Sequence, residues 1–249
     1  MKRTKVRLDK LLVELGLCES RTKAQALILE GRVKVNLGNG KFQIIDKPGT
    51  PVFTDAKVEI VEKIPYVSRG GLKLEGALKG FSIDVKDMVC LDVGASTGGF
   101  THCLLVHGAK RVYALDVGKG QLHYELRRNP RVIVMEKVNA RYLTPDMFPE
   151  KFDLITMDVS FISVKKILPV LPPLLKTKGL ILTLVKPQFE AGKSFVKKGI
   201  VKNPWVHKEV VNDIWNFGQE LGLYPQGVVQ SPLPGVKGNI EFFILFKTY

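Results

Sequence analysis

The chain has 249 residues, of which 45% are hydrophobic and 25% are charged, and this composition excludes a disordered or fibrous protein. Lys and Arg number 38 against 24 Asp and Glu, so the formal net charge is +14. Such an excess of positive charge favours a polyanionic partner, with nucleic acid ahead of an anionic membrane surface. The alternative is a basic surface that is merely solvated.

Apolar runs in the sequence are short, and cysteines are few. Stretches such as residues 180–185 fall far short of the roughly 20 residues that span a bilayer, and we see no secretory signal. Cys18, Cys90 and Cys103 are odd in number and lack paired spacing, so we expect neither a disulfide framework nor a zinc site. We therefore expect a cytoplasmic protein with no membrane segment.

The first 63 residues have the pattern of a small α+β module. Leucines recur at helical spacing over residues 8–15, and Gly16 follows as a stop signal. Ser20 is a typical N-cap for a second helix that ends at Gly31. Alternating residues at 33–35 and 58–61 predict short strands.

Positive charge is concentrated in this module, because residues 1–34 carry nine Lys or Arg and four Asp or Glu. Arg21 and Lys23 fall at the start of the second predicted helix, where unpaired backbone N–H groups also attract phosphate. The pattern indicates a grip on phosphate groups. The alternative is a helix with a charged, solvated face.

Three segments of the module carry a family resemblance: Arg-Leu-Asp-Lys-Leu-Leu from Arg7, Ser-Arg-Thr-Lys-Ala from Ser20, and Ile-Leu-Glu-Gly-Arg-Val-Lys-Val-Asn from Ile28. They resemble the S-four RNA-binding module, which is shared by a small-subunit ribosomal protein, pseudouridine synthases and tyrosyl-tRNA synthetases. The resemblance implies a folded RNA partner, recognised mainly by its shape and phosphates. The RNA contacts expected here are Arg3, Arg7, Arg21, Lys23, Arg32 and Lys34.

From about residue 85, apolar strand patterns alternate with helical patterns, which predicts an α/β fold with a parallel sheet covered by helices. Two late strands are separated only by a Pro/Gly-rich loop and predict an antiparallel edge. The predicted strands are 89–93, 112–115, 132–135, 152–157, 179–185, 227–230 and 240–246, and the predicted helices are 99–106 and 121–128.

Ionisable residues stand at the ends of four predicted parallel strands: Asp92, Asp116, Asp158 and Lys186. Ligands of open α/β sheets bind outside the carboxyl ends of the strands. A single acid there could simply cap a helix, but four such residues predict a binding site.

The loop after the first of these strands is rich in glycine but has neither the G-x-G-x-x-G spacing nor a following Gly-Lys-Ser/Thr, so a dinucleotide or P-loop site is disfavoured. Asp116 is placed to accept hydrogen bonds from a ribose. The pattern fits S-adenosylmethionine, with its amino-acid part in the loop and its adenine near Asn139. The alternative for Asn139 is an ordinary turn residue. The expected cofactor contacts are Asp92, Gly94, Ser96, Thr97, Gly98, Gly99, Phe100, Asp116, Val117, Asn139 and Asp158.

The group that accepts the methyl can be narrowed by exclusion. Methylation of base nitrogens often uses an Asn/Asp-Pro-Pro-aromatic loop, whereas residues 157–161 read Met-Asp-Val-Ser-Phe. Methylation of a pyrimidine carbon needs a cysteine nucleophile, and Cys90 and Cys103 fall within a predicted strand and a predicted helix. A ribose hydroxyl remains, and it requires a general base.

Lys186 is the candidate base, because a desolvated lysine beside a sulfonium and a second lysine is disfavoured in its charged form. Asp158 would hold the amine in line, while Lys73 and Glu241 would orient the ribose. Spacing alone leaves open that Lys73 is a solvated helix residue and Glu241 an edge-strand acid.

Six segments of the larger domain carry a second resemblance; they begin at Tyr66, Leu91, Ala114, Met157, Leu184 and Ser231. Together they closely resemble the TlyA (haemolysin A) family of rRNA 2′-O-methyltransferases, whose catalytic domain is similar to the FtsJ/RrmJ enzymes. The resemblance implies a Rossmann-like class I S-adenosylmethionine-dependent methyltransferase sheet at residues 68–249, joined by a linker at 64–67 to the RNA-binding domain at 1–63.

The same resemblance implies methylation of cytidine ribose in ribosomal RNA by a Lys-Asp-Lys-Glu tetrad. By motif position the tetrad is Lys73, Asp158, Lys186 and Glu241. Some members have Arg-x-Trp-Val in the linker where this chain has Ile-Pro-Tyr-Val, and Pro65 restricts that hinge.

Further basic residues surround the predicted site and are expected to contact RNA, with a solvated loop as the alternative: Arg69, Lys193, Lys197, Lys198 and Lys237. The four histidines lack ligand spacing, so no metal is expected. We expect a monomer or weak dimer that binds ribosomal RNA or ribosomal subunits. Two other functions stay open: a catalytically inactive RNA-binding assembly factor and, less favoured, a haemolysin.

Overall fold

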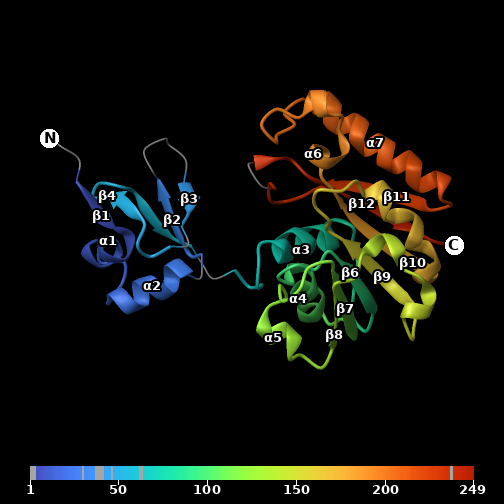
Figure 1. Ribbon diagram of the computed structural model, residues 1–249, viewed down its shortest axis with the longest axis horizontal. Helices are drawn as coiled ribbons and strands as arrows, with labels where there is room; N and C mark the ends of the chain where they lie inside the picture. Colours follow the sequence, from blue (N-terminus) through green and yellow to red (C-terminus); the bar gives the residue numbers. More distant parts are fainter. Residues whose placement is uncertain (1–3, 30, 37–41, 46, 62–63, 236–237) are drawn as a thin grey trace. The chain divides into compact units, whose positions relative to one another are not determined.

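The computed structural model describes the chain except residues 1–3, 30, 37–41, 46, 62–63 and 236–237 (Figure 1). The chain divides into two compact units, Met1–Pro65 and Tyr66–Tyr249. The division falls within the segment expected to be the linker. Among the described residues, no helix is both long enough and apolar enough to cross a bilayer.

The first unit packs two helices on short strands. Its core contains Leu8, Leu11 and Leu12 from the first helix and Ala24 and Ile28 from the second, as the helical spacing predicts. Strand β2 lies between β3 and β5, and β1 pairs with β4, all antiparallel. The elements are β1 (Lys5–Arg7), α1 (Leu8–Glu14), α2 (Arg21–Leu29), β2 (Val33–Asn36), β3 (Phe42–Ile44), β4 (Pro51–Phe53) and β5 (Val58–Ile60).

The second unit is built on a seven-stranded sheet in the order β11-β12-β10-β9-β6-β7-β8. The five strands from β10 to β8 are parallel, and β12 pairs antiparallel with both β10 and β11, which confirms the predicted α/β class and antiparallel edge. The strands are β6 (Val89–Val93), β7 (Arg111–Asp116), β8 (Val132–Glu136), β9 (Phe152–Met157), β10 (Leu175–Val185), β11 (Tyr224–Gln230) and β12 (Phe242–Lys247).

Helices cover both faces of this sheet (Figure 1), which explains why all five residues of β6 are buried. Leu91 and Val93 of β6 share a core with Val206 and Ile214 of α7. Asp92, which lies between Leu91 and Val93 in the strand, points to the opposite face of the sheet, toward α4. The helices are α3 (Gly70–Gly80), α4 (Gly99–Val106), α5 (Tyr124–Arg127), α6 (Pro187–Glu190) and α7 (Pro204–Glu220).

Short 3₁₀ helices connect several strands: η1 (Ala140–Tyr142), η2 (Pro145–Met147), η3 (Val164–Lys166), η4 (Leu168–Val170), η5 (Pro172–Leu174) and η6 (Lys193–Phe195). The helix predicted at 121–128 is shorter in the structure, where His123 caps its start by accepting a hydrogen bond from the amide of Glu125. Strand β10 is longer than predicted, because it starts at Leu175 and passes through a register shift before Leu180.

Candidate active site

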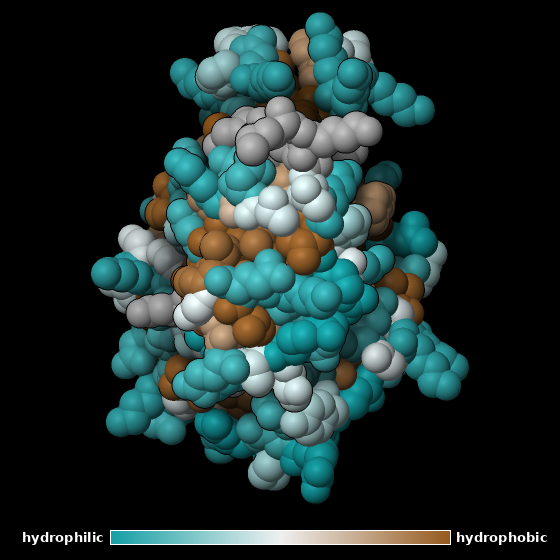
Figure 2. Space-filling model, turned by 90° about the vertical axis from the view of Figure 1, so that its left-hand side faces the viewer, coloured by the Kyte–Doolittle hydropathy of each residue, from teal (hydrophilic) through white to brown (hydrophobic). Residues whose placement is uncertain are grey.

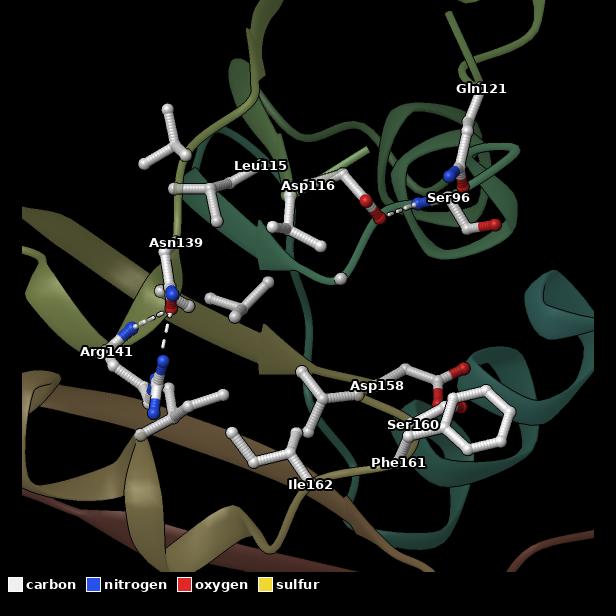
Figure 3. Close-up of a pocket in the computed structure, with 17 residues that line it drawn as sticks. Ser96, Leu115, Asp116, Gln121, Asn139, Arg141, Asp158, Ser160, Phe161 and Ile162 are labelled. Carbon is white, nitrogen blue, oxygen red and sulfur yellow. Dashed lines mark hydrogen bonds between the residues drawn. The ribbon is translucent and has the colours of Figure 1, made fainter. Parts of the chain in front are cut away.

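A cavity of about 740 Å³ opens at the carboxyl edge of the parallel strands, where β6, β7, β8 and β9 end (Figure 3). The strand order reverses beside β6, so this is the switch point where open α/β sheets bind ligands. The volume suits a nucleoside-sized molecule. The cavity is lined by residues 93, 94, 96, 115–117, 121, 138–141, 158–162 and 167.

Asp116 is the last residue of β7, and its side chain holds the glycine-rich loop that follows β6. One carboxylate oxygen accepts a hydrogen bond from the Ser96 amide at 2.8 Å (Figure 3). The other accepts one from the Gly118 amide at 2.7 Å. Each carboxylate oxygen keeps further lone pairs. The side chain is therefore fixed in the cavity wall and can still accept hydrogen bonds from a diol.

Asn139 lies on the opposite wall of the cavity and caps η1. Its Oδ1 accepts hydrogen bonds from the Arg141 amide at 3.1 Å and from Arg141 Nε at 3.4 Å (Figure 3). Asn139 therefore does act as a turn residue, which was the alternative considered from the sequence. Its side-chain NH₂ stays in the cavity wall as a hydrogen-bond donor.

Gly94 lets two loops approach each other at the floor of the cavity. Its φ is +85°, and a Cβ atom there would lie 2.6 Å from the carbonyl oxygen of Asp158. A side chain would push apart the ends of β6 and β9. Gly94 therefore keeps Asp158 next to the glycine-rich loop.

Six of the expected cofactor residues line the cavity: Gly94, Ser96, Asp116, Val117, Asn139 and Asp158. The other five lie outside its lining: Asp92, Thr97, Gly98, Gly99 and Phe100. Gly98 caps the start of α4, Gly99 is its first residue, and both pack on neighbouring elements; the Phe100 ring is buried 6.0 Å from that of Phe243. The carbonyl of Thr97 accepts a hydrogen bond from the amide of His123. These five residues therefore support the glycine-rich loop and do not face the cavity.

Asp92 is fully buried beneath the cavity. Its carboxylate accepts hydrogen bonds from the hydroxyls of Thr101 at 2.7 Å and Thr156 at 3.1 Å. Burial raises the pKa of Asp92 to about 7, against the effect of these two hydrogen bonds. Asp92 thus joins α4 to the sheet.

The pKa of Asp92 gives the first prediction. In the unfolded chain an aspartate has a pKa of about 4. Between about pH 4 and 7 the folded state therefore binds one more proton than the unfolded state, and stability falls as pH rises. Asp92→Asn keeps the shape without the charge. We expect it to remove this slope and to raise the free energy of unfolding at pH 8 by up to about 4 kcal/mol.

Denaturant unfolding at pH 5 and pH 8, followed by tryptophan fluorescence, measures this effect. Both tryptophans of the chain lie in α7, so the signal reports on the second unit. Asp146→Asn, at an exposed position, serves as the control and should change stability by less than about 0.5 kcal/mol. Equal destabilisation by Asp92→Asn at both pH values would contradict the prediction.

Lys186 and Asp158 follow directly after β10 and β9, and neighbouring parallel strands bring them together. The Lys186 Nζ lies 2.6 Å from Oδ1 of Asp158 and donates a hydrogen bond to Ser160 Oγ at 2.8 Å. The lysine side chain is only 10% exposed, against 23% for the aspartate. The amine is thus held in a nearly dry position beside Asp158, which lines the cavity.

Glu190 connects the loop that follows Lys186 with the loop that follows Asp158. Its carboxylate accepts hydrogen bonds from Ser163 Oγ at 2.5 Å and from the Val164 amide at 2.9 Å. Glu190 ends α6, four residues after Lys186, while Ser163 is five residues after Asp158. The bridge limits how far the two catalytic candidates can move apart.

Lys73 and Glu241 form a second ion pair across 168 sequence positions, with 2.6 Å between Nζ and Oε2. Lys73 projects from α3, and Glu241 immediately precedes β12. The side chains are 12% and 2% exposed. The backbone at Gly235 lies directly against the Glu241 carboxylate, where a Cβ atom would collide with it.

The two ion pairs meet at a second cavity of about 390 Å³, whose walls include Lys186 and Glu241. Gln188 connects them, because it follows Lys186 by two residues and donates a weak hydrogen bond of 3.4 Å to Glu241 Oε1. Ser160 and Phe161 line both cavities. All four predicted catalytic residues therefore belong to one connected site.

Comparison with known proteins identifies the family. The FtsJ-like methyltransferase family matches residues 66–248, and the S4 domain, the S-four module, matches residues 6–52. The chain is 44% identical to the 16S/23S rRNA (cytidine-2′-O)-methyltransferase TlyA of Mycobacterium tuberculosis (strain CDC 1551 / Oshkosh), over 98% of this chain and 90% of that one. The chain belongs to the TlyA family of FtsJ-like methyltransferases.

Two further relatives agree with this assignment, one by its sequence and the other by both its sequence and its fold. YqxC of Bacillus subtilis (strain 168) is 48% identical over 96% of this chain and 85% of its own length. A solved structure from Streptococcus thermophilus superposes with a TM-score of 0.77 at 43% identity, covering 98% of this chain and 88% of that one. The resemblance drawn from the motifs is thereby confirmed.

Phe161 is a site feature of this TlyA-family chain for which sequence reasoning predicted no separate role. Its side chain is 92% exposed and its φ is +64°, a conformation that bulky residues rarely adopt. The ring lies 5.1 Å from that of Phe189. An exposed aromatic ring held in a strained turn between two cavities is typical of a ligand contact.

In the S4 unit, the expected RNA contacts lie at or near the surface. Arg7 and Arg21 both pair with Asp9, while Lys23 pairs with Glu19 at 2.8 Å. Arg32 donates a hydrogen bond to the carbonyl of Val61, and Lys34 lies in β2. Arg3 is outside the described residues.

In the methyltransferase unit, Arg69, Lys193, Lys197 and Lys198 are exposed, and Lys237 is outside the described residues. Arg69 donates a hydrogen bond of 3.4 Å to the carbonyl of Pro234. The face of the molecule drawn in Figure 2, which is not that of this unit alone, is hydrophilic over much of its area, with a hydrophobic area near its centre. Within the described part of the chain, no group of three or more His, Cys, Asp and Glu could hold a metal ion.

Proposed function

We propose that this chain transfers a methyl group from S-adenosylmethionine to the 2′-hydroxyl of a cytidine in ribosomal RNA. The observation that carries the proposal is the two largely buried lysine–carboxylate pairs, one beside the nucleoside-sized cavity and the other at the adjoining second cavity. The name of the Mycobacterium tuberculosis relative supports the choice of cytidine in 16S and 23S rRNA.

The cavity fits the cofactor by the chemistry of its walls. Asp116 offers carboxylate oxygens to a ribose diol, and Asn139 offers an amide to an adenine edge. Leu115, Val138 and Ile162 supply apolar surface for a flat ring. When bound there, S-adenosylmethionine would supply a methyl group on a positively charged sulfur, and that sulfur would keep the bonding electron pair on transfer.

Within this proposal, Lys186 is the general base. In its neutral form the amine accepts the proton of the 2′-hydroxyl while the ribose oxygen forms its bond to the methyl carbon. Asp158 holds the Nζ atom at 2.6 Å, and Ser160 fixes it from another side. Asp158 also lines the cofactor cavity, where its carboxylate would favour a positive charge.

The second ion pair orients the substrate in this proposal. Glu241 fixes the ammonium of Lys73, which can donate further hydrogen bonds to ribose or phosphate oxygens. Phe161 offers its exposed ring to a nucleotide base beside the second cavity. Residues 1–63 and the exposed lysines near the site would hold the RNA through its phosphates.

Methylation of ribosomal RNA by the purified full-length chain tests the proposal. With S-adenosylmethionine and ribosomal subunits as substrates, we expect methyl groups on the 2′-oxygen of cytidine, mapped by resistance of the adjoining linkage to alkaline hydrolysis. Methyl transfer to a base, or no transfer to any ribosomal substrate, would refute it.

A further inference from the structure

In the first unit, one buried acid collects an unusual number of cationic and polar donors. The side chain of Asp9 has no exposed surface. Its carboxylate accepts hydrogen bonds from Arg7 Nε at 3.0 Å, Arg7 Nη2 at 2.9 Å, Arg21 Nη2 at 2.9 Å and Gln25 Nε2 at 2.8 Å. Asp9 therefore has donors on both oxygens and no contact with solvent.

These donors come from two separate elements. Arg7 ends β1 immediately before α1, while Arg21 is the first residue of α2 and Gln25 follows one turn later. Arg7 is confined on a second side as well, because a Cβ atom at Gly49 would lie only 3.1 Å from its Nη1. The carboxylate thus fixes two guanidinium groups that long side chains would otherwise leave mobile.

The arrangement directs positive charge outward. Each arginine side chain is 50% exposed, whereas the acid beneath them is 0% exposed. The described contacts of Arg21 use one of its five N–H donors. The Arg7 guanidinium holds the pKa of the Asp9 carboxyl well below its usual range, with Gln25 and Arg21 acting in the same direction against burial.

We propose that Asp9 is a positioning residue for RNA binding: by holding Arg7 and Arg21 in one fixed pair, this acid strengthens the grip on RNA phosphates. The inference rests on the proposed function in one respect, that RNA is the partner. Guanidinium groups match phosphate geometry in a planar fork, and ordering them before binding avoids the entropy cost of ordering them on contact.

The sign of one mutational effect tests this proposal. Removing a negative charge should by itself tighten binding to a polyanion. We expect Asp9→Asn instead to weaken binding by about tenfold, because the new NH₂ group faces donors and releases the arginines. Glu14→Gln, which removes an exposed charge from the same helix, should leave binding unchanged or slightly tighter.

Binding of the full-length variants to deproteinised 16S and 23S rRNA is measured over a range of salt concentrations. The slope of affinity against salt should stay the same in Asp9→Asn, since every Lys and Arg is retained. If folded Asp9→Asn binds as tightly as the unmodified chain, the inference is overturned. If the unmodified chain itself fails to bind or methylate RNA, the proposed function fails instead.

A second pair of variants decides the matter even if Asp9→Asn fails to fold. Arg21→Lys keeps the charge but loses the planar fork, and we expect roughly fivefold weaker binding at an unchanged salt slope. Lys10→Arg is the control, because this exposed lysine of α1 is outside the expected RNA contacts. Equal affinities for Arg21→Lys, Lys10→Arg and the unmodified chain would overturn the proposal.

Discussion

Replacement of Lys186 by alanine is expected to lower the rate of methyl transfer by about 10²- to 10⁴-fold, the usual contribution of a general base. The amine is 10% exposed and is fixed by Asp158 and Ser160, so the structure offers solvent little access to take its place. Cofactor binding should change little, because Lys186 lies outside the lining of the larger cavity.

Single-turnover methylation of ribosomal subunits measures the rate, and calorimetry with S-adenosylmethionine measures cofactor binding. Lys208→Ala, at an exposed position on α7, is the control and should keep the rate of the unmodified chain. Near-normal methylation by Lys186→Ala would remove this lysine from the proposed mechanism. Loss of cofactor binding together with activity would instead assign it to the cofactor site.

The parallel strands could be predicted from sequence because a strand that is buried on both faces appears as a nearly continuous run of hydrophobic residues. Strand β9 matches the predicted 152–157, and β6 the predicted 89–93. The small strands β1, β3 and β4 were missed, because three residues carry little periodicity, whereas the equally short β5 was found because Val-Glu-Ile-Val alternates clearly at 58–61. Helix α5 was overestimated because its predicted first turn is irregular backbone.

The functional residues likewise divide into those that the sequence predicted correctly and those that it did not. Asp116 and Asp158 were found because a strand end is a local feature of the chain. Asp92 shows the limit of that rule: it is the fourth residue of β6 and points away from the cavity, whereas Val93 after it lines the cavity. Strand alternation decides which residue faces a ligand, and the register relative to the sheet faces is a tertiary property.

Pairing across the fold could not be derived from spacing. Lys73 and Glu241 approach because α3 packs on α4 while β12 enters the sheet beside β10. Family resemblance nominated both residues, and the structure adds that they form a contact. The exposure of Phe161 depends on a positive φ angle, for which its sequence neighbours give no signal.

Replacement of Glu241 by glutamine is expected to affect both stability and catalysis. It leaves the Lys73 ammonium, 12% exposed, without its charged partner, at a cost of about 3 kcal/mol. Gln keeps the shape that the Gly235 backbone requires, so steric effects are small. The rate of methyl transfer should fall at least about tenfold, because Lys73 loses the group that orients it.

A double variant separates the two effects. Adding Lys73→Met to Glu241→Gln removes the unpaired charge, so most of the lost stability should return while methyl transfer stays low. Denaturant unfolding by tryptophan fluorescence and single-turnover methylation give the two readouts on the same samples. Additive losses of stability would mean that the two side chains are not energetically coupled. Recovery of methylation in the double variant would mean that the pair supports only the fold, and the proposed mechanism would then rest on Lys186 and Asp158 alone.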